Sequence, residues 1–238
     1  MTRPRALLSW SSGKDSAWAL HVLRSRGDVD IVGLLTTVNE GFARVAMHGV
    51  REALVREQAR AVGLPLRPVP LPWPCPNDAY EAAMSTALAR ARDDGVTHIA
   101  FGDLFLEDIR AYREERMAAA GFTPVFPLWG LDTSELARDM IAGGTRATIV
   151  CVDPAQLDAR FCGRSYDTAL LSELPSWVDP CGERGEFHTF VSDGPAFQHP
   201  VACTPGEIVQ RDGFVFADVL PVESERRPLS SVGRAGDS

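Results

Sequence analysis

Residues 11–16, Ser-Ser-Gly-Lys-Asp-Ser, bring three hydroxyls, an amine and a carboxylate together around one glycine. An apolar strand is expected from Arg5 to Trp10, and a helix from about Asp15 to Arg26. The start of a helix has unpaired N–H groups and a partial positive charge, which suit an anion such as phosphate. The spacing is not that of the Walker loop. We therefore expect a phosphate-binding loop or, as the simpler alternative, an ordinary serine-capped helix start.

Lys14 is the one lysine among 24 basic residues, all the others being arginine. The arginine bias is typical of a GC-rich genome and carries little functional information. The lysine that is kept is more informative, because a compact ammonium fits a tight phosphate site in which a planar guanidinium does not. Lys14 is thus the candidate cation of the loop.

A second polar cluster surrounds the glycines at 182 and 185. It comprises Glu183, Glu186, His188 and Asp193. A strand is expected from Phe187 to Ser192, and alternation gives it two faces, one with Glu186, His188 and Phe190 and the other with Phe187, Thr189 and Val191. We expect the carboxylates and His188 to line one wall of a cleft. A solvated hairpin is the alternative, since turns often contain Gly, Asp and Pro.

Gly102-Asp103 ends a short strand expected from His98, the position at which open α/β sheets bind ligands. Asp103 is a candidate ligand of Mg²⁺ or of a ribose, with helix capping as the alternative. Arg110 and Arg113 follow one helical turn apart in a charged helix. They form either a phosphate clamp or a solvated face that pairs with neighbouring glutamates.

Strands and helices alternate through the first half of the chain. Strands are expected at Arg5–Trp10, Asp30–Val38, Leu66–Leu71, His98–Gly102 and Thr123–Pro127. Helices are expected at Asp15–Arg26, Val50–Val62, Asn77–Asp94 and Glu107–Ala120, and a loop at Asn39–Gly49. This alternation predicts an α/β fold with a parallel sheet and helices on both faces.

The pattern changes after Trp129. Asp132 and Glu135 form a capping pair for a helix to Ala142, and Arg146–Val152 is a strand. Asp212-Gly213 is a hairpin turn between two further strands. We expect residues 1–130 to form one domain, residues 131–222 a smaller α+β domain, and the polar residues 223–238 a flexible tail.

The composition excludes several classes of protein. The 238 residues are 45% hydrophobic and 24% charged, which excludes wholesale disorder, collagen and coiled coil. A run of about 18 apolar residues is lacking, as is a secretory signal, so we expect a cytoplasmic protein without a membrane partner. The net charge of −8 argues against non-specific nucleic-acid binding. The five cysteines include no C-x-x-C pair, which argues against a zinc site or a disulfide scaffold.

Two of the motifs resemble those of known enzymes. Residues 11–16 resemble the S-G-G-K-D-S pyrophosphate loop of the PP-loop ATPases (N-type ATP pyrophosphatases), with Ser12 in place of the first glycine. A serine there either keeps an ordinary backbone conformation or adds some strain. Residues 182–197 resemble the G-E-N-G-E-[YF]-H-T-x-V-x-D-G-P-x-F signature of the diphthine–ammonia ligase family, with Arg184 in place of Asn. Further similarity to the family's bacterial branch is carried by Phe101-Gly102-Asp103, Arg110, Arg113-Glu114 and Pro127-Leu128-Trp129.

The resemblance implies a Rossmann-like fold of the adenine nucleotide alpha hydrolase type, with an ATP-binding domain at residues 1–130 and a substrate-binding domain at residues 131–222. It implies a ligase that uses ATP and Mg²⁺ to adenylate a carboxylate, releases pyrophosphate and transfers ammonia. It implies ATP contacts from Ser11, Ser12, Gly13, Lys14, Asp15, Ser16, Gly102, Asp103 and Arg113. It further implies Mg²⁺ contacts from Asp15 and Asp103, and catalytic roles for Lys14, Asp15, Glu183, Glu186 and His188.

The carboxylate substrate, a small molecule or a protein side chain, is not identified by the sequence, and neither is the oligomeric state. Archaeal and eukaryotic members of the family act on diphthine, which is not expected in the GC-rich bacterium that the arginine bias indicates. Two alternative functions are sulfur transfer to tRNA and nucleotide binding without catalysis. The acidic charge and the missing C-x-x-C argue against the first, and Lys14, Asp15 and Asp103 argue against the second.

Overall fold

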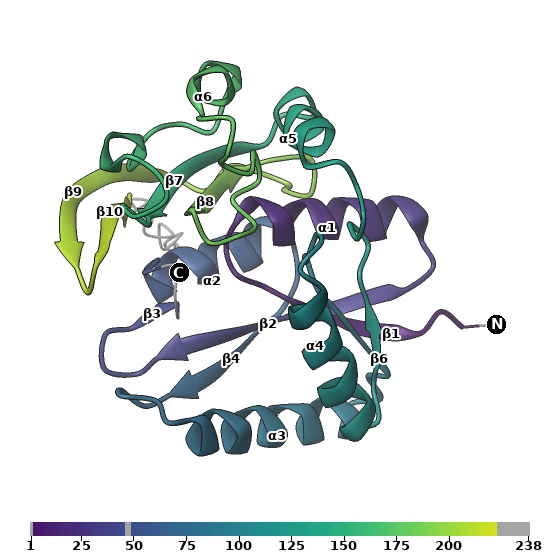
Figure 1. Ribbon diagram of the computed structural model, residues 1–238. Helices are drawn as coiled ribbons and strands as arrows, with labels where there is room; N and C mark the ends of the chain where they lie inside the picture. Colours follow the sequence, from purple (N-terminus) through teal and green to yellow (C-terminus); the bar gives the residue numbers. More distant parts are fainter. Residues whose placement is uncertain (1, 46–48, 223–238) are drawn as a thin grey trace, which may run out of the picture.

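The computed structural model describes residues 2–45 and 49–222 of the chain, which form two β-sheets with helices around them (Figure 1). The larger sheet contains β1 (Arg5–Ser9), β2 (Asp30–Asn39), β3 (Arg44–Val45), β4 (Leu66–Leu71), β5 (His98–Ala100) and β6 (Thr123–Val125). Five of these strands are parallel and lie in the order β4-β2-β1-β5-β6. The α/β fold predicted from the sequence is confirmed.

The segment Asn39–Gly49, predicted as a loop, contains the short strand β3. It pairs antiparallel with the end of β2, through Val38 with Val45 and Asn39 with Arg44. A strand of two residues has too short an alternation to be recognised in a sequence. The Val45 N–H also donates a hydrogen bond to the Val50 carbonyl (2.8 Å), two residues before the next helix begins.

Helices cover both faces of the larger sheet. They are α1 (Lys14–Arg26), α2 (Glu52–Ala61), α3 (Asn77–Asp93) and α4 (Glu107–Ala119). Side chains alternate between the faces of a strand. Accordingly, Leu8 and Leu34 belong to the same buried cluster as residues of α1 and α2, whereas Leu7 and Leu35 pack in a cluster with residues of α3 and α4.

Strand β4 contains two prolines and lies at an edge of the sheet. In the described part of the chain it pairs only with β2. Pro68 and Pro70 are two residues apart, so the positions of their missing N–H groups face the same side of the strand. An edge strand tolerates this because one side needs no ladder partner, which explains how a proline-containing segment forms a strand here.

The C-terminal half forms a smaller antiparallel sheet. Its elements are α5 (Thr133–Ala142), β7 (Arg146–Val152), the 3-10 helix η1 (Ala159–Phe161), α6 (Thr168–Glu173), β8 (Phe187–Asp193), β9 (Cys203–Arg211) and β10 (Phe214–Pro221). The strand order is β8-β7-β10-β9. The predicted cap of α5 is confirmed, since the Asp132 carboxylate accepts a hydrogen bond from the Glu135 N–H (2.9 Å). The predicted hairpin at Asp212-Gly213 is also confirmed, because β9 and β10 pair through it.

The flexible tail expected at residues 223–238 lies outside the described residues. Among the helices that the structure describes, none is both long and apolar enough to cross a lipid bilayer.

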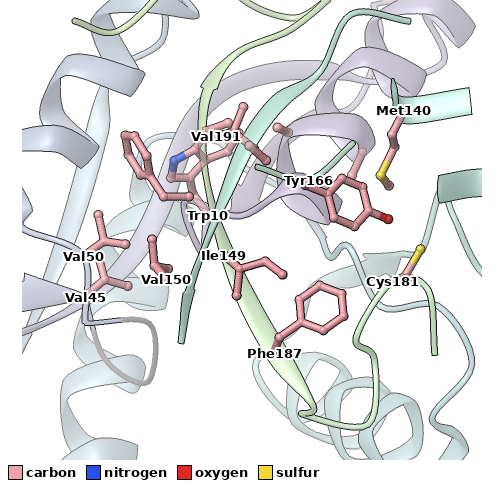
Figure 2. Close-up of a cluster of buried hydrophobic side chains, with 14 of the residues drawn as sticks. Trp10, Val45, Val50, Met140, Ile149, Val150, Tyr166, Cys181, Phe187 and Val191 are labelled. Atoms are coloured by element: carbon pink, nitrogen blue, oxygen red, sulfur yellow. The ribbon is translucent and has the colours of Figure 1, made fainter. Parts of the chain in front are cut away.

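The two sheets share one buried core. Helices α1 and α2 lie between them (Figure 1). Trp10, at the end of β1, packs in the same buried cluster as Ile149 of β7 and Val191 of β8 (Figure 2). Asp218 of β10 pairs with Arg44 (3.0 Å) and Arg51 (2.5 Å) of the first half. This contact holds β10 against β3 and the start of α2. The first turn of α1 meets the C-terminal half at β8, where the Lys14 N–H donates to the Thr189 hydroxyl.

Candidate functional site

The loop of residues 10–13 lies at the switch point of the parallel sheet. Strand β1 is flanked by β2 on one side and by β5 on the other, and the chain leaves β1 toward one face and β5 toward the other. Open α/β sheets form a crevice where neighbouring connections diverge in this way, at the carboxyl ends of the strands. The segments after β1 and β5 carry residues 11–16 and Gly102-Asp103 of the predicted site.

These two segments touch at Gly102. A Cβ atom on Gly102 would lie 3.0 Å from the Asp15 carbonyl carbon and 3.1 Å from the Ser16 nitrogen. Backbone atoms cannot yield to such a contact, so a larger residue would push the segment after β5 away from the first turn of α1. Gly102 thus brings Asp103 close to the start of this helix.

Hydroxyl groups surround the N-terminus of α1. The Ser16 hydroxyl donates to the Gly13 carbonyl (3.0 Å), and the Ser11 hydroxyl accepts from the Gly13 N–H (3.3 Å). The Lys14 N–H donates to the Thr189 hydroxyl of β8 (3.1 Å). The helix start is therefore held by serines of its own loop and by a threonine of the C-terminal sheet.

Ser12 has a left-handed backbone conformation, with φ of 71°. Of the two expectations for a serine at this position, the strained one is confirmed. Its carbonyl accepts hydrogen bonds from the Val191 N–H (3.0 Å) and from the Gln58 side chain (3.0 Å). Its hydroxyl is buried and has no hydrogen-bond partner within residues 2–45 and 49–222. Ser12 is not among the residues that line the cavity described below, so its contribution is to the shape of the loop.

The ammonium of Lys14 is buried, with 2% of the residue exposed. It donates to both carboxylate oxygens of Asp15 (2.9 Å each) and to the Cys181 carbonyl. The rings of Tyr166 and Phe187 lie 5.5 and 5.6 Å from it, and Figure 2 shows these rings beside Cys181. Burial opposes the charge, but the adjacent Asp15 carboxylate outweighs it and raises the pKa of Lys14. The raised pKa favours the charged, ammonium form of Lys14 at this site.

Asp103 and Arg113 form an ion pair beside the loop. The Arg113 Nη2 donates to Asp103 Oδ1 (3.1 Å). The Arg113 Nε lies 2.7 Å from Asp103 Oδ2, but its N–H is not aligned for a hydrogen bond, so this contact is an ion pair only. Burial raises the pKa of Asp103, and Arg113 partly offsets this. Of the two predicted arginines, Arg113 reaches the site, whereas Arg110 pairs with Glu114 (2.7 Å) and stacks on Trp129 (4.6 Å).

Glu183 reaches the site from the C-terminal half. Its carboxylate accepts from the Leu104 N–H (2.8 Å), which ties the turn before β8 to the segment after β5. Burial raises the pKa of Glu183 to about 7, and the nearby carboxylates of Asp15 and Asp103 act in the same direction. A carboxyl with this pKa can release or accept a proton near neutral pH.

Glu186 does not share a wall with Glu183, in contrast to the sequence expectation. It is buried, and its carboxylate accepts from the backbone N–H groups of Asp179 (2.8 Å) and Arg184 (2.9 Å). These bonds hold the turn that carries Glu183. Phe187, His188 and Thr189 all line the cavity, although alternation predicts that His188 lies on the opposite face of β8 from the other two. Opposite this part of β8, strand β7 contains a β-bulge in which Val150 is the extra residue between the partners of Thr189 and His188.

A cavity of about 230 Å³ brings these groups together. Its lining comprises Ser9, Ser11, Gly13, Lys14, Asp15, Ser16, Phe101, Gly102, Asp103, Arg113, Cys181, Gly182, Glu183, Phe187, His188 and Thr189. Thr189 was missed by the sequence analysis. No local signal identifies it, because its partner Lys14 is 175 positions away in the chain.

A second cavity, of about 1100 Å³, adjoins the first. The two share Ser9, Ser11, Phe101 and Arg113. The larger one lies over the face of the sheet covered by α3 and α4, and is lined mainly by apolar residues such as Leu35 and Met117. Thr36 of β2 is also a lining residue, and its buried hydroxyl has no hydrogen-bond partner among the described residues. A polar and an apolar cavity thus meet beside the loop.

Within residues 2–45 and 49–222, no group of three or more His, Cys, Asp or Glu side chains is arranged to hold a metal ion. Mg²⁺ does not need such a group, since it is commonly held by one or two carboxylates together with substrate phosphates. Asp15 and Asp103 both line the small cavity, and Asp103 Oδ2 accepts no hydrogen bond from the part of the chain that the structure describes. The residues therefore fit Mg²⁺ that arrives with a phosphate ligand.

The fold and the loop define a Rossmann-like α/β protein, a class that binds nucleotides at the switch point of its sheet. One family model, diphthamide synthase N-terminal domain, matches residues 4–119, and another, diphthamide synthase C-terminal domain, matches residues 132–217. Through both domains, the chain belongs to the diphthamide synthase family.

The chain is also similar to diphthine–ammonia ligases of eukaryotes. It is 28% identical over 151 residues to that of Homo sapiens, covering 61% of this chain and 56% of the relative. It is 25% identical over 160 residues to that of Mus musculus (65% and 60%). It is 32% identical over 87 residues to that of Schizosaccharomyces pombe, covering 35% of this chain and 14% of the relative. The chain thus spans little more than half of the mammalian relatives, and its place in a bacterial branch stays a prediction.

Proposed function

We propose that this chain is an ATP-dependent amide ligase that adenylates a carboxylate, releases pyrophosphate and transfers ammonia. The observation that carries the proposal is the convergence of Lys14, Asp103, Arg113 and Glu183 on one polar cavity at the switch point of the sheet. The names of the relatives support the reaction class, and the loop sequence supports ATP as the activating substrate. A cytoplasmic location goes with this proposal as a prediction.

In this proposal, each of the two cavities binds a different part of the nucleotide. The small polar cavity takes the β- and γ-phosphates, with the N–H groups of α1, the hydroxyls of Ser11 and Ser16, and Lys14 as donors. The large apolar cavity takes the nucleoside, for which the Thr36 hydroxyl offers an unused hydrogen bond. Mg²⁺, held by Asp15 and Asp103, would neutralise phosphate charge.

The chemistry requires activation because a carboxylate oxygen is a poor leaving group. The substrate carboxylate attacks the α-phosphorus, and the bond to the bridging oxygen of pyrophosphate breaks. Negative charge then grows on the departing pyrophosphate, where the buried Lys14 ammonium stabilises it. Ammonia next attacks the acyl carbon and AMP leaves. Glu183, with its pKa of about 7, accepts the proton that the nitrogen loses.

The remaining predicted residues have supporting roles in this proposal. His188 lines the same cavity as Glu183 and orients the acyl substrate. Glu186 positions the turn of Glu183 and touches no substrate, in place of the catalytic role expected from the sequence. The acyl substrate is a carboxylic acid, for which the diphthine named in the relatives is one candidate.

The test is an assay of AMP and pyrophosphate with ATP, Mg²⁺ and ammonium, against a panel of carboxylic acids and a diphthine-containing peptide. The expected result is equal release of AMP and pyrophosphate that depends on both the acid and ammonium. Two outcomes would overturn the proposal. ATP that binds but is never cleaved would indicate a nucleotide-binding module, and acid-independent cleavage stimulated by tRNA would indicate a tRNA-modifying enzyme.

A further inference from the structure

Gln58 of α2 is completely buried, and both N–H groups of its side-chain amide donate hydrogen bonds. Its Oε1 accepts from the Trp10 indole N–H (2.9 Å). Its Nε2 donates to the carbonyls of Ser12 (3.0 Å) and Val191 (2.6 Å). The amide oxygen and both amide N–H groups therefore have hydrogen-bond partners, which offsets the cost of burying them. Because the Trp10 indole can only donate, it also fixes which way the amide points.

The three partners of Gln58 lie in two of the segments that build the site. Trp10 and Ser12 belong to the loop between β1 and α1, and Val191 is in β8. The Val191 N–H also donates to the Ser12 carbonyl (3.0 Å), so loop and strand are joined both directly and through Gln58. Gln58 is therefore the one side chain in the described part of the chain that bonds to all three of these residues.

The left-handed conformation of Ser12 explains why this anchor is needed. A non-glycine residue in this conformation is unfavourable and persists only where surrounding contacts hold it. The two N–H donors on the Ser12 carbonyl fix the peptide plane between Ser12 and Gly13. The N–H groups of Gly13 and Lys14 follow directly, so the direction of these donors depends on that plane.

We propose that Gln58 is a positioning residue that holds the loop in its phosphate-binding conformation and couples it to β8. Gln58 lines neither cavity and so touches neither the nucleoside nor the phosphates. Its effect on a bound ligand is therefore exerted through the loop amides. The part of this inference that concerns phosphate rests on the proposed function.

The substitution Gln58→Met tests the proposal, because it keeps most of the volume and removes all three hydrogen bonds. Val55→Ala is the matched control, since Val55 is also fully buried in α2, belongs to the buried apolar cluster, and has a side chain that makes no hydrogen bond. Calorimetric titration measures the binding of a non-hydrolysable ATP analogue, of pyrophosphate and of adenosine. The expected result for Gln58→Met is a loss of about tenfold or more in affinity for the two phosphate ligands, with adenosine affinity unchanged. An equal loss for Val55→Ala, or an equal loss for adenosine, would overturn the proposal.

Amide hydrogen exchange, measured on the protein without ligand, tests this inference independently of the proposed function. In Gln58→Met the amides of Gly13, Lys14 and Val191 are expected to exchange about tenfold faster or more than in Val55→Ala. Unchanged exchange overturns the positioning role whatever the protein binds. Faster exchange in a protein that binds neither ATP nor pyrophosphate supports the anchor and refutes the proposed function. If Gln58→Met does not fold, Gln58→Glu carries the same test, because it keeps an acceptor for Trp10 but has no N–H for Ser12 and Val191.

Discussion

The backbone N–H of Lys14 donates a hydrogen bond of 3.1 Å to the hydroxyl of Thr189, which lies 175 residues later in the chain. One residue belongs to the first turn of α1 and the other to β8 of the smaller sheet. The C-terminal half therefore completes the start of the helix at which the phosphates are proposed to bind. The Cys181 carbonyl, which accepts from the Lys14 ammonium, acts in the same way.

Thr189→Val should weaken ATP binding and lower the free energy of unfolding by about 0.5–2 kcal/mol, the cost of losing a helix cap. The reason is that the Lys14 N–H then loses its acceptor while the shape of the side chain is kept. Urea unfolding and calorimetric titration measure the two effects. Thr189→Ser restores the hydroxyl and should recover both, and a serine variant as impaired as the valine variant would contradict the cap.

Lys14→Met should reduce pyrophosphate release by about 10²–10³-fold, because the leaving group loses its buried cation. The measurement is pyrophosphate production at saturating ATP. The variant must be shown to be folded by circular dichroism, since Asp15 loses its ion-pair partner. Arg60→Ala, at a side chain that is 60% exposed, is the control and should keep the original rate. Pyrophosphate release by Lys14→Met at the rate of that control would exclude the role given to Lys14.

Ser12→Gly should raise the free energy of unfolding by about 1 kcal/mol. Glycine relieves the left-handed strain, worth about 1–2 kcal/mol, and removes a buried hydroxyl without a partner, while it adds about 0.5–1 kcal/mol of backbone entropy cost. Urea unfolding of both proteins gives the difference directly. Ser12→Ala is the control, because it removes the hydroxyl but keeps the strain. A glycine variant less stable than the alanine variant would show that the strain is not relieved.

Glu183→Gln should change how stability depends on pH. The pKa of Glu183 is about 7 in the folded protein, above its usual 4.5, so the folded state binds this proton more tightly than the unfolded state. The resulting contribution is fully present below pH 4.5 and is lost as the pH rises through about 7. In Glu183→Gln the decline in unfolding free energy across this window should be shallower. Glu57→Gln, at an exposed carboxylate, is the control, and identical pH profiles for all three proteins would count against the shifted pKa.

Glu186→Gln should impair adenylation and ammonia transfer to the same extent. The carboxylate accepts from two backbone N–H groups, and an amide has only one oxygen to offer them. The lost bond costs about 1–3 kcal/mol of stability and loosens the turn that carries Glu183. Single-turnover measurements of the two partial reactions test this. A selective loss of ammonia transfer would instead indicate direct contact of Glu186 with the nucleophile.

Much of the fold was predictable because its signals are local. The strand–loop–helix around residues 11–16, the cap at Asp132 and the hairpin at Asp212-Gly213 each depend on residues close together in sequence. Short or irregular features were not predictable. Strand β3 has two residues, and the bulge beside His188 follows from how β7 pairs with β8, which alternation within one strand does not reveal.

Sequence alone pointed to the loop of residues 11–16, to Lys14 within it, and to the turn that carries Glu183 and Glu186. Residue type and spacing suffice to recognise groups that can bind an anion or transfer a proton. Tertiary structure decided which of these groups meet. It brought Asp103, Arg113 and Glu183 to Lys14, placed Glu186 under the turn, and recruited Thr189 and Gln58. The physical reason is that hydrogen bonds and burial act between atoms close in space, and the fold brings together residues that are far apart along the chain.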